Sequence, residues 1–258
     1  MRFLILAVAI MTAVVSFGSH RAEADQLKLR IATEGTYRPM SYFDSAGNLT
    51  GFEIDLVNAI CAKIGAECEF ITMDIDGMIP ALQEKKVDGI ASGFRVTEKR
   101  KKIIDFADKY YTPYAQFVTC SHINQKDTSP EAMKGLVIGT QASSSNADFL
   151  NGRFTGTATV RLYKTMDEAY LDLAAGRLDA VMSNAFIGYD FVHSEKGEKC
   201  AFIGDKVVDP KLFGDGTAIG VRKGDDATRL KLNEGIKAIM ADGTYEKINA
   251  KYWPFSVK

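Results

Sequence analysis

Three short segments carry charged and hydroxyl side chains that could bind a small charged molecule. A basic run at residues 98–102 (EKRKK) contains Arg100, whose planar guanidinium could hold a carboxylate through two parallel hydrogen bonds. Ser143 and Ser144 open a predicted helix, and the free backbone amides at a helix N-terminus favour anions. Glu34 offers a carboxylate for a cationic group. On composition alone the basic run would be solvated surface, the serines helix caps and Glu34 a surface acid.

Neither composition nor motifs point to catalysis, a metal or a nucleic acid. The sequence has no Ser-His-Asp set, glycine-rich phosphate loop or metal-ligand spacing, and His20, His122 and His193 are too scattered for a zinc site. The 32 Lys and Arg residues against 33 Asp and Glu residues lack the basic excess of a nucleic-acid binder. With 46% hydrophobic and 25% charged residues, the 258-residue chain has a globular composition and length for one or two domains. We therefore expect no cofactor, no metal and no nucleic-acid partner.

The N-terminal segment has the pattern of a secretory signal peptide. Arg2 supplies a positive charge, residues 3–17 form an apolar run, and Ala22 and Ala24 place small residues at the −3 and −1 positions of a cleavage site. A membrane-spanning helix needs about 20 apolar residues, more than this run provides. We therefore expect residues 1–24 to be a cleaved signal peptide and the exported product to be soluble.

Four cysteines in the exported part indicate disulfides, because an even count in an oxidising compartment favours bridges over metal binding. Cys61 and Cys68 lie at the end of a predicted helix and the start of the next strand, close enough for a local bridge. Cys120 and Cys200 could form a second bridge or remain as buried thiols. A catalytic cysteine lacks a supporting His or Asn context.

Two similar units of strands and helices must position these residues. The first alternates predicted strands and helices at 27–33, 51–64, 67–72, 78–84 and 87–92, and the second at 137–140, 143–150, 159–163, 166–175 and 178–183. This βαβαβ order predicts an α/β fold with mostly parallel sheets and covering helices in two lobes. Residues 114–120 and 217–221 are interpreted as connections between the lobes, and two tail helices, at 226–240 and 244–252, are expected to return to the first lobe.

Five strings in this order resemble the periplasmic solute-binding proteins that deliver polar amino acids to ABC transporters. They are TEGTYRP (33–39), GFEIDL (51–56), VTEKR followed by IDF (96–106), GRLDA (176–180) and DGTY (242–245). The resemblance spans nearly the whole exported chain and is strongest to lysine/arginine/ornithine, histidine and opine binders. It implies a periplasmic location, an inner-membrane ABC permease as partner, and a monomer that encloses its ligand between closing lobes. It also implies two hinge strands, a first lobe of residues 25–112 and 210–258, and a second lobe of residues 113–209.

The resemblance also implies the roles of individual residues. Arg100 matches the family's carboxylate clamp, assisted by the backbone amides of Arg95 and Ser144. Glu34 matches the acid that meets a distal cationic group in binders of basic ligands, and Tyr37 matches an aromatic wall. The complete predicted ligand-binding set is Glu34, Tyr37, Ser92, Gly93, Arg95, Arg100, Thr140, Ser143, Ser144 and Asn184.

Four positions depart from the family pattern. Asn184 and Gly93 replace the Asp and Ser that hold the α-ammonium of ordinary amino-acid ligands, Arg95 replaces a small Ser, and Ile75 replaces a second aromatic wall. These departures predict an opine, that is, an amino acid whose α-nitrogen carries a carboxyalkyl or sugar-derived substituent. The alternative is a diverged amino-acid binder in which water fills the gaps.

Two other function classes remain open at this point. Periplasmic cyclohexadienyl (arogenate/prephenate) dehydratases share the fold, and Glu34 could be the general acid that such an enzyme needs. A sensor module that presents its ligand to a membrane receptor is the third possibility. Binding for import is the preferred interpretation, and we do not expect an enzyme.

Overall fold

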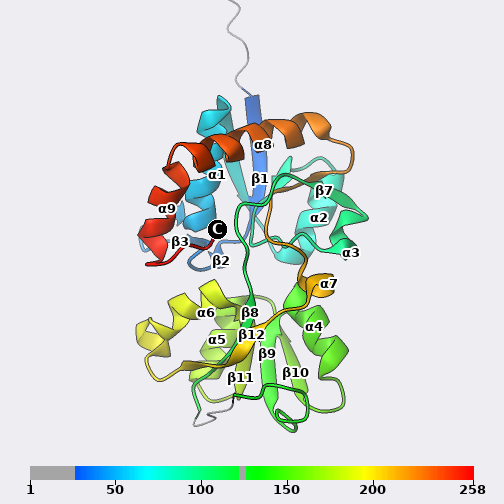
Figure 1. Ribbon diagram of the computed structural model, residues 1–258, viewed down its shortest axis with the longest axis vertical. Coiled ribbons are helices and arrows are strands. Elements are labelled where there is room, and N and C mark those ends of the chain that lie inside the picture. Colours follow the sequence, from blue (N-terminus) through cyan, green and yellow to red (C-terminus); the bar gives the residue numbers. More distant parts are fainter. Residues whose placement is uncertain (1–26, 122–125) are drawn as a thin grey trace, which may run out of the picture.

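A computed structural model describes residues 27–121 and 126–258 of the chain, and the predicted signal peptide lies outside these residues. Two five-stranded sheets form two lobes, one above the other in Figure 1. The first sheet has the order β5 (Ala66–Thr72), β1 (Leu27–Thr33), β6 (Gly89–Ile90), β13 (Gly220–Arg222) and β7 (Ile104–Phe106). The second has the order β10 (Thr159–Tyr163), β9 (Val137–Gln141), β11 (Ala180–Asn184), β8 (Ala115–Thr119) and β12 (Ala201–Val207). β13 in the first sheet and β8 in the second run antiparallel to both of their neighbours, and the other pairs are parallel. Two such sheets with their helices confirm the predicted two-lobed α/β fold.

Helices cover the first sheet because their apolar faces have the helical period. α1 (Phe52–Lys63) buries Ile54, Leu56, Val57 and Ile60. Both tail helices, α8 (Asp226–Ala241) and α9 (Thr244–Tyr252), pack against α1, as the tail was expected to do. Two short helices, α2 (Ile75–Gln83) and α3 (Glu98–Lys101), lie on the same lobe, together with a small sheet of β2 (Thr36–Tyr37), β3 (Ser41–Phe43) and β4 (Leu49–Thr50).

The second lobe repeats this arrangement with α4 (Ser145–Arg153), α5 (Met166–Ala174) and α6 (Ala185–Val192). A capping box starts α5, in which the Thr165 hydroxyl accepts from the Glu168 amide and the Glu168 carboxylate accepts from the Thr165 amide. A short helix, α7 (Pro210–Phe213), packs against α4. The strands β9, β10 and β11 run parallel, and β8 and β12 are antiparallel neighbours.

The chain passes between the two sheets twice, before β8 and after β12 (Figure 1). Tyr111 on the first passage pairs with Thr217 on the second in an antiparallel bridge. The interpretation of residues 114–120 as the connection was wrong in part, because residues 115–119 form β8 inside the second sheet. Similarly, residues 220–222 of the return belong to the first sheet as β13, and the passage itself precedes them.

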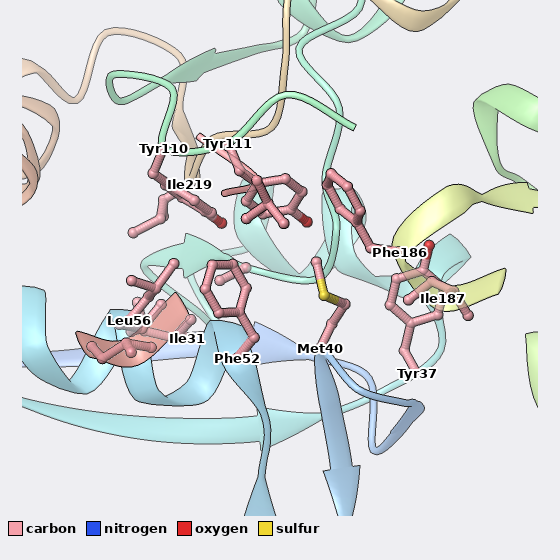
Figure 2. Packing of buried hydrophobic residues seen from close by; sticks show 14 of the residues in the cluster. Ile31, Tyr37, Met40, Phe52, Leu56, Tyr110, Tyr111, Phe186, Ile187 and Ile219 are labelled. Atoms are coloured by element: carbon pink, nitrogen blue, oxygen red, sulfur yellow. The ribbon is translucent and has the colours of Figure 1, made fainter. Parts of the chain in front are cut away.

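An aromatic cluster joins the lobes near the small sheet. Figure 2 shows Tyr111 between Tyr110 and Phe52 on one side and Phe186 of the second lobe on the other. The ring centroids of Phe52 and Tyr111 lie 5.8 Å apart, and those of Tyr111 and Phe186 lie 6.2 Å apart. Aromatic pairs at these separations contribute about 0.5–1.5 kcal/mol beyond their buried area.

Both cysteine pairs are joined. Cys61 of α1 is bonded to Cys68 of β5, which confirms the predicted local bridge. Cys120, at the end of β8, is bonded to Cys200, just before β12, so the pairing left open by the sequence is formed. None of the helices over 27–121 and 126–258 is both long and apolar enough to span a bilayer.

Candidate ligand-binding site

A cavity between the lobes is lined by loops that follow the strands of both sheets. In the first sheet β1 and β6 are parallel, and Glu34 and Ser92 lie just beyond their carboxyl ends. In the second sheet β9 and β11 are parallel and end at Gln141 and Asn184. Carboxyl ends of parallel strands share one edge of a sheet, where α/β proteins bind ligands. The cavity has a volume of about 20 Å³, and its lining residues are Tyr37, Ile75, Ser92, Gly93, Arg95, Arg100, Gln141, Ser144, Ser145, Asn146 and Asn184.

Most of the predicted site residues meet at this cavity. Glu34 is adjacent, because it is hydrogen-bonded to two lining residues. Ser143 lies on a neighbouring cavity instead. Thr140 is fully buried away from the lining, and its hydroxyl donates to the Met182 carbonyl at 2.8 Å. Thr140 therefore ties β9 to β11.

Glu34 is a buried carboxyl held by partners from both lobes. Its Oε1 accepts from Gln141 Nε2 at 2.5 Å, and its Oε2 accepts from Ser92 Oγ at 3.2 Å. Burial raises the pKa of Glu34 to about 7, although both hydrogen bonds act in the opposite direction. Gln141 was not predicted as a site residue. The sequence feature that could have indicated it is its position between the predicted strand at 137–140 and the serines at 143 and 144.

Arg100 and Arg95 are two cations on the same cavity. The Arg100 guanidinium carbon lies 3.6 Å from the centroid of the Phe94 ring, and its Nη1 donates to the Arg95 carbonyl at 3.2 Å. Burial and the neighbouring charge of Arg95 lower the pKa of Arg100 to about 10. The Arg100 guanidinium makes no other hydrogen bond to residues 27–121 or 126–258, so its remaining donors can bind an oxyanion that enters the cavity.

Arg95 is more deeply enclosed than Arg100, with 5% of its surface exposed. Its guanidinium carbon lies 4.6 Å from the Phe213 ring centroid, and burial lowers its pKa to about 10. Nη2 of Arg95 is buried without a hydrogen-bond partner among the described residues. A buried donor of this kind is costly unless something pairs with it. The Arg95 side chain, whose direction could not be predicted from the sequence, therefore faces the lobe interface and not solvent.

The start of α4 supplies a neutral anion-favouring element. The Ser144 hydroxyl accepts from the Ala147 amide at 3.1 Å and donates to the Gln141 carbonyl at 2.7 Å. Ser144 is therefore the N-cap of α4, and the positive end of the helix dipole points into the cavity. No group of carboxylates, cysteines or histidines suited to a metal ion occurs among residues 27–121 and 126–258.

Tyr37, Gly93 and Asn184 shape the remaining wall. Gly93 has a φ of 60°, and a Cβ at this position would lie 2.8 Å from Cε1 of Tyr37. A serine here would therefore be strained and would press on the tyrosine ring. Asn184 Oδ1 accepts from the Phe186 amide at 3.0 Å and caps α6. Neither position offers a free carboxylate or hydroxyl to a ligand ammonium.

Glu53 is a second buried acid that sequence reasoning did not assign. Its Oε2 accepts from the Gly93 amide at 2.5 Å, and its Oε1 accepts from the Tyr110 hydroxyl at 2.5 Å. Burial raises the pKa of Glu53 to about 7. Through these bonds α1 fixes both the loop that lines the cavity and the first passage between the lobes.

The chain matches proteins known to bind solutes. The family model of bacterial extracellular solute-binding proteins, family 3, matches residues 29–255. An L-arginine-binding protein of Pseudomonas aeruginosa is 36% identical over 100% of this chain and 98% of its own length. A histidine-binding periplasmic protein of Escherichia coli K12 is 35% identical over 100% of this chain and 99% of its own length.

Solved structures agree with these relatives. An ancestral arginine-binding protein bound to arginine has a TM-score of 0.80 at 33% identity, over 88% of this chain and 98% of that one. A Salmonella typhimurium periplasmic binding protein described for its high arginine specificity has a TM-score of 0.81 at 27% identity, over 88% of this chain and 99% of that one. This chain belongs to family 3 of the bacterial extracellular solute-binding proteins.

Proposed function

We propose that the protein is the periplasmic binding component of an ABC importer and captures an amino-acid-derived solute between its lobes. The observation that carries the proposal is that Arg100 and the α4 N-terminus line one cavity, with Glu34 hydrogen-bonded to two further lining residues. The two positive elements suit a carboxylate, and Glu34 suits a cationic end. The names of the relatives, which include arginine, histidine and lysine/arginine/ornithine binders, support the same solute class.

We infer more narrowly that the preferred ligand is an opine, an N-substituted amino acid with a second carboxylate. Arg95 and Arg100 bring two cations to the cavity, and only one of them is needed for an α-carboxylate. The unpartnered Nη2 of Arg95 suits an additional oxyanion. Asn184 and Gly93 withhold the acceptors that a free α-ammonium would need.

The remaining expectations extend this proposal. The first 24 residues are removed on export, and the monomeric product delivers its ligand to an inner-membrane permease. The proposed first lobe comprises residues 25–112 and 210–258, and the second comprises residues 113–209, so that closure buries the ligand. The boundary at residue 210 is too early, because α7 packs against α4 and Phe213 lies in the core of the second lobe.

Mass spectrometry of small molecules released by denaturing the purified protein is the first test. We expect a zwitterionic amino-acid derivative in the released fraction. Calorimetry then compares Arg100→Ala with Lys102→Ala, an exposed cation two residues away. Loss of one partner of an enclosed charge pair costs about 2–5 kcal/mol, so Arg100→Ala should bind at least about thirty-fold more weakly, whereas Lys102→Ala should be unchanged. Near-wild-type affinity of Arg100→Ala would remove Arg100 from the site.

The dehydratase alternative has a direct assay as well. Incubation with prephenate or arogenate should yield no aromatic product above the uncatalysed rate. Product formation that is lost in Glu34→Gln would establish Glu34 as a general acid and overturn the assignment as a binding protein.

A further inference from the structure

We propose that Glu53 is a positioning residue that couples the movement of the lobes to the loop at residues 92–95, which lines the central cavity. We call this loop the cavity loop. The inference rests on the proposed function, because it concerns how the same cavity is held ready for its ligand. Glu53 is fully buried on α1 and does not itself line the cavity. It acts through the groups that its two carboxylate oxygens hold.

The two oxygens of Glu53 hold two different parts of the molecule. Oε2 accepts from the Gly93 amide of the cavity loop at 2.5 Å, and Oε1 accepts from the Tyr110 hydroxyl of the first passage at 2.5 Å. Tyr110 lies where the two passages are joined, because its amide donates to the Thr217 carbonyl at 3.0 Å. The Thr217 amide donates in turn to the Tyr111 carbonyl at 2.9 Å. Hydrogen bonds to a carboxylate are strong and directional, so Glu53 ties the cavity loop to the point where both passages meet.

The second lobe contacts the first passage at the adjacent residue, Tyr111. The Tyr111 ring centroid lies 6.2 Å from that of Phe186, and Figure 2 shows the two rings side by side. The Phe186 amide donates to Oδ1 of Asn184, which lines the cavity from the second lobe. Contiguous packed side chains and hydrogen bonds can carry coupling between separate parts of a protein. A rotation of the second lobe therefore acts on the passage residues that adjoin the Glu53 contact.

The cavity loop supports the charged groups that we propose bind the ligand. The Ser92 hydroxyl donates to Glu34 Oε2 at 3.2 Å, and Arg95 is itself a loop residue. The Phe94 ring centroid lies 3.6 Å from the guanidinium carbon of Arg100. A shift of the loop would displace the groups for the anionic and the cationic end of the ligand together. Since a loosened loop must be ordered again on binding, its loosening should weaken all ligands by the same factor.

The experiment breaks the tie at the passage and measures ligand affinity by calorimetry. Tyr110→Phe removes the hydroxyl that Glu53 holds and keeps the ring beside Tyr111, whose centroid is 5.3 Å away. The matched control is Tyr252→Phe. The Tyr252 hydroxyl also donates to a carboxylate of α1, that of Asp55, at 3.0 Å, but Tyr252 lies on the tail helix α9 and not on a passage.

Arginine and Nα-carboxyethyl-arginine are titrated separately at pH 8, above the pKa of about 7 to which burial raises Glu53. We expect Tyr110→Phe to weaken both ligands by the same factor, at least about five-fold, and Tyr252→Phe to stay within about two-fold of wild type. A variant that is merely less stable but still folded keeps its affinity, so this measurement separates positioning from a structural role. Exchange of the Gly93 amide, followed by NMR in the ligand-free protein, should be faster in Tyr110→Phe and unchanged in Tyr252→Phe.

A double-mutant cycle tests whether the two residues act through their shared bond. Glu53→Gln keeps the size of the side chain but leaves a carbonyl oxygen for only one of the two donors. The double variant Glu53→Gln/Tyr110→Phe should bind no more weakly than the weaker of the two single variants. If Tyr110→Phe does not fold, Glu53→Gln takes its place in the titrations, with Asp55→Asn as the control on the same helix.

Wild-type affinity of Tyr110→Phe, unequal losses for the two ligands, or additive losses in the double variant would each overturn the coupling and leave the proposed function standing. Failure of the wild-type protein to bind either ligand would overturn the proposed function and the coupling together. The wild-type titrations therefore distinguish the two failures.

Discussion

Replacement of Arg95 by Met should make the protein more stable and at the same time a weaker binder of its preferred ligand. The side chain is enclosed, and its Nη2 lacks a protein partner. Methionine keeps an unbranched stem of similar length against Phe213 but removes the charge. A substitution that only damaged the fold would lower both properties, so the two opposite changes test a binding role for this cation.

The magnitudes follow from the burial of the guanidinium. Lowering of the Arg95 pKa from 12.5 to about 10 corresponds to about 3 kcal/mol of unfavourable burial of the charge. The stacking contact with Phe213 returns about 0.5–2 kcal/mol. We therefore expect the free energy of unfolding of Arg95→Met to rise by about 1–3 kcal/mol. An enclosed charge pair with a ligand carboxylate contributes about 2–5 kcal/mol, so affinity for the opine Nα-carboxyethyl-arginine should fall by at least about thirty-fold.

Urea denaturation measures the first change, and calorimetry with arginine and Nα-carboxyethyl-arginine measures the second. The matched control is Arg153→Met, because Arg153 also lies over a phenylalanine, Phe149, but on the surface and paired with Asp209. Arg153→Met should alter neither affinity. If Arg95→Met is destabilised and loses affinity for both ligands equally, Arg95 is a structural residue and the argument for a second carboxylate fails.

Three further predictions concern other parts of the site and fold. Burial raises the pKa of Glu34 to about 7, and a guanidinium ligand favours its ionised form, so the affinity for the ligand should fall by about thirty-fold from pH 8 to pH 5.5. A plot of affinity against pH that is flat for the wild type, or that slopes equally for Glu34→Gln, would contradict this. Asn184→Asp keeps the cap of α6 and adds a carboxylate, so calorimetry should show at least a ten-fold relative shift toward free arginine; unchanged selectivity would show that position 184 does not face the α-nitrogen. Loss of the Cys120–Cys200 bridge should lower the free energy of unfolding in urea by about 4–5 kcal/mol, because it closes a loop with a sequence separation of 80. Loss of the Cys61–Cys68 bridge, with a separation of 7, should lower it by about 2–3 kcal/mol, and the reverse order would refute the loop-closure reasoning.

Elements with strong local patterns were predictable from the sequence. The helix α9 (Thr244–Tyr252) and the strand β1 (Leu27–Thr33) have the predicted bounds, because their periodicity and flanking residues are local properties. The helix α6 was missed. It follows β11 without an intervening turn, and Asn184 both ends the strand and caps the helix. Its sequence, AFIGYDFV, is apolar on most of its surface and lacks a clear helical period.

Pairing between distant strands was less predictable. The strand β12 lies at a sheet edge beside β8, and its sequence alone did not indicate that partner. The predicted strand over residues 87–92 is reduced to β6 (Gly89–Ile90), since the residues beyond it turn into the cavity loop. The predicted helix over residues 78–84 begins earlier, at Ile75, with Asp74 at its N-cap position.

In the site, too, residues in local motifs were predictable and contacts between distant segments were not. Motif resemblance predicted that Arg100, Ser144 and Asn184 would meet, and they line one cavity. Gln141 could not be found in this way, because its role depends on a contact with Glu34, 107 residues away in the sequence.

The most direct test of the central claim is a calorimetric titration of the wild-type protein with arginine and with Nα-carboxyethyl-arginine, at the same pH and salt concentration. The proposed pairing of a second carboxylate with Arg95, and the withheld ammonium acceptors at Asn184 and Gly93, predict tighter binding of the carboxyethyl derivative. Tighter binding of plain arginine would contradict the opine assignment, and failure to bind either ligand would contradict a site that joins Arg100 to Glu34.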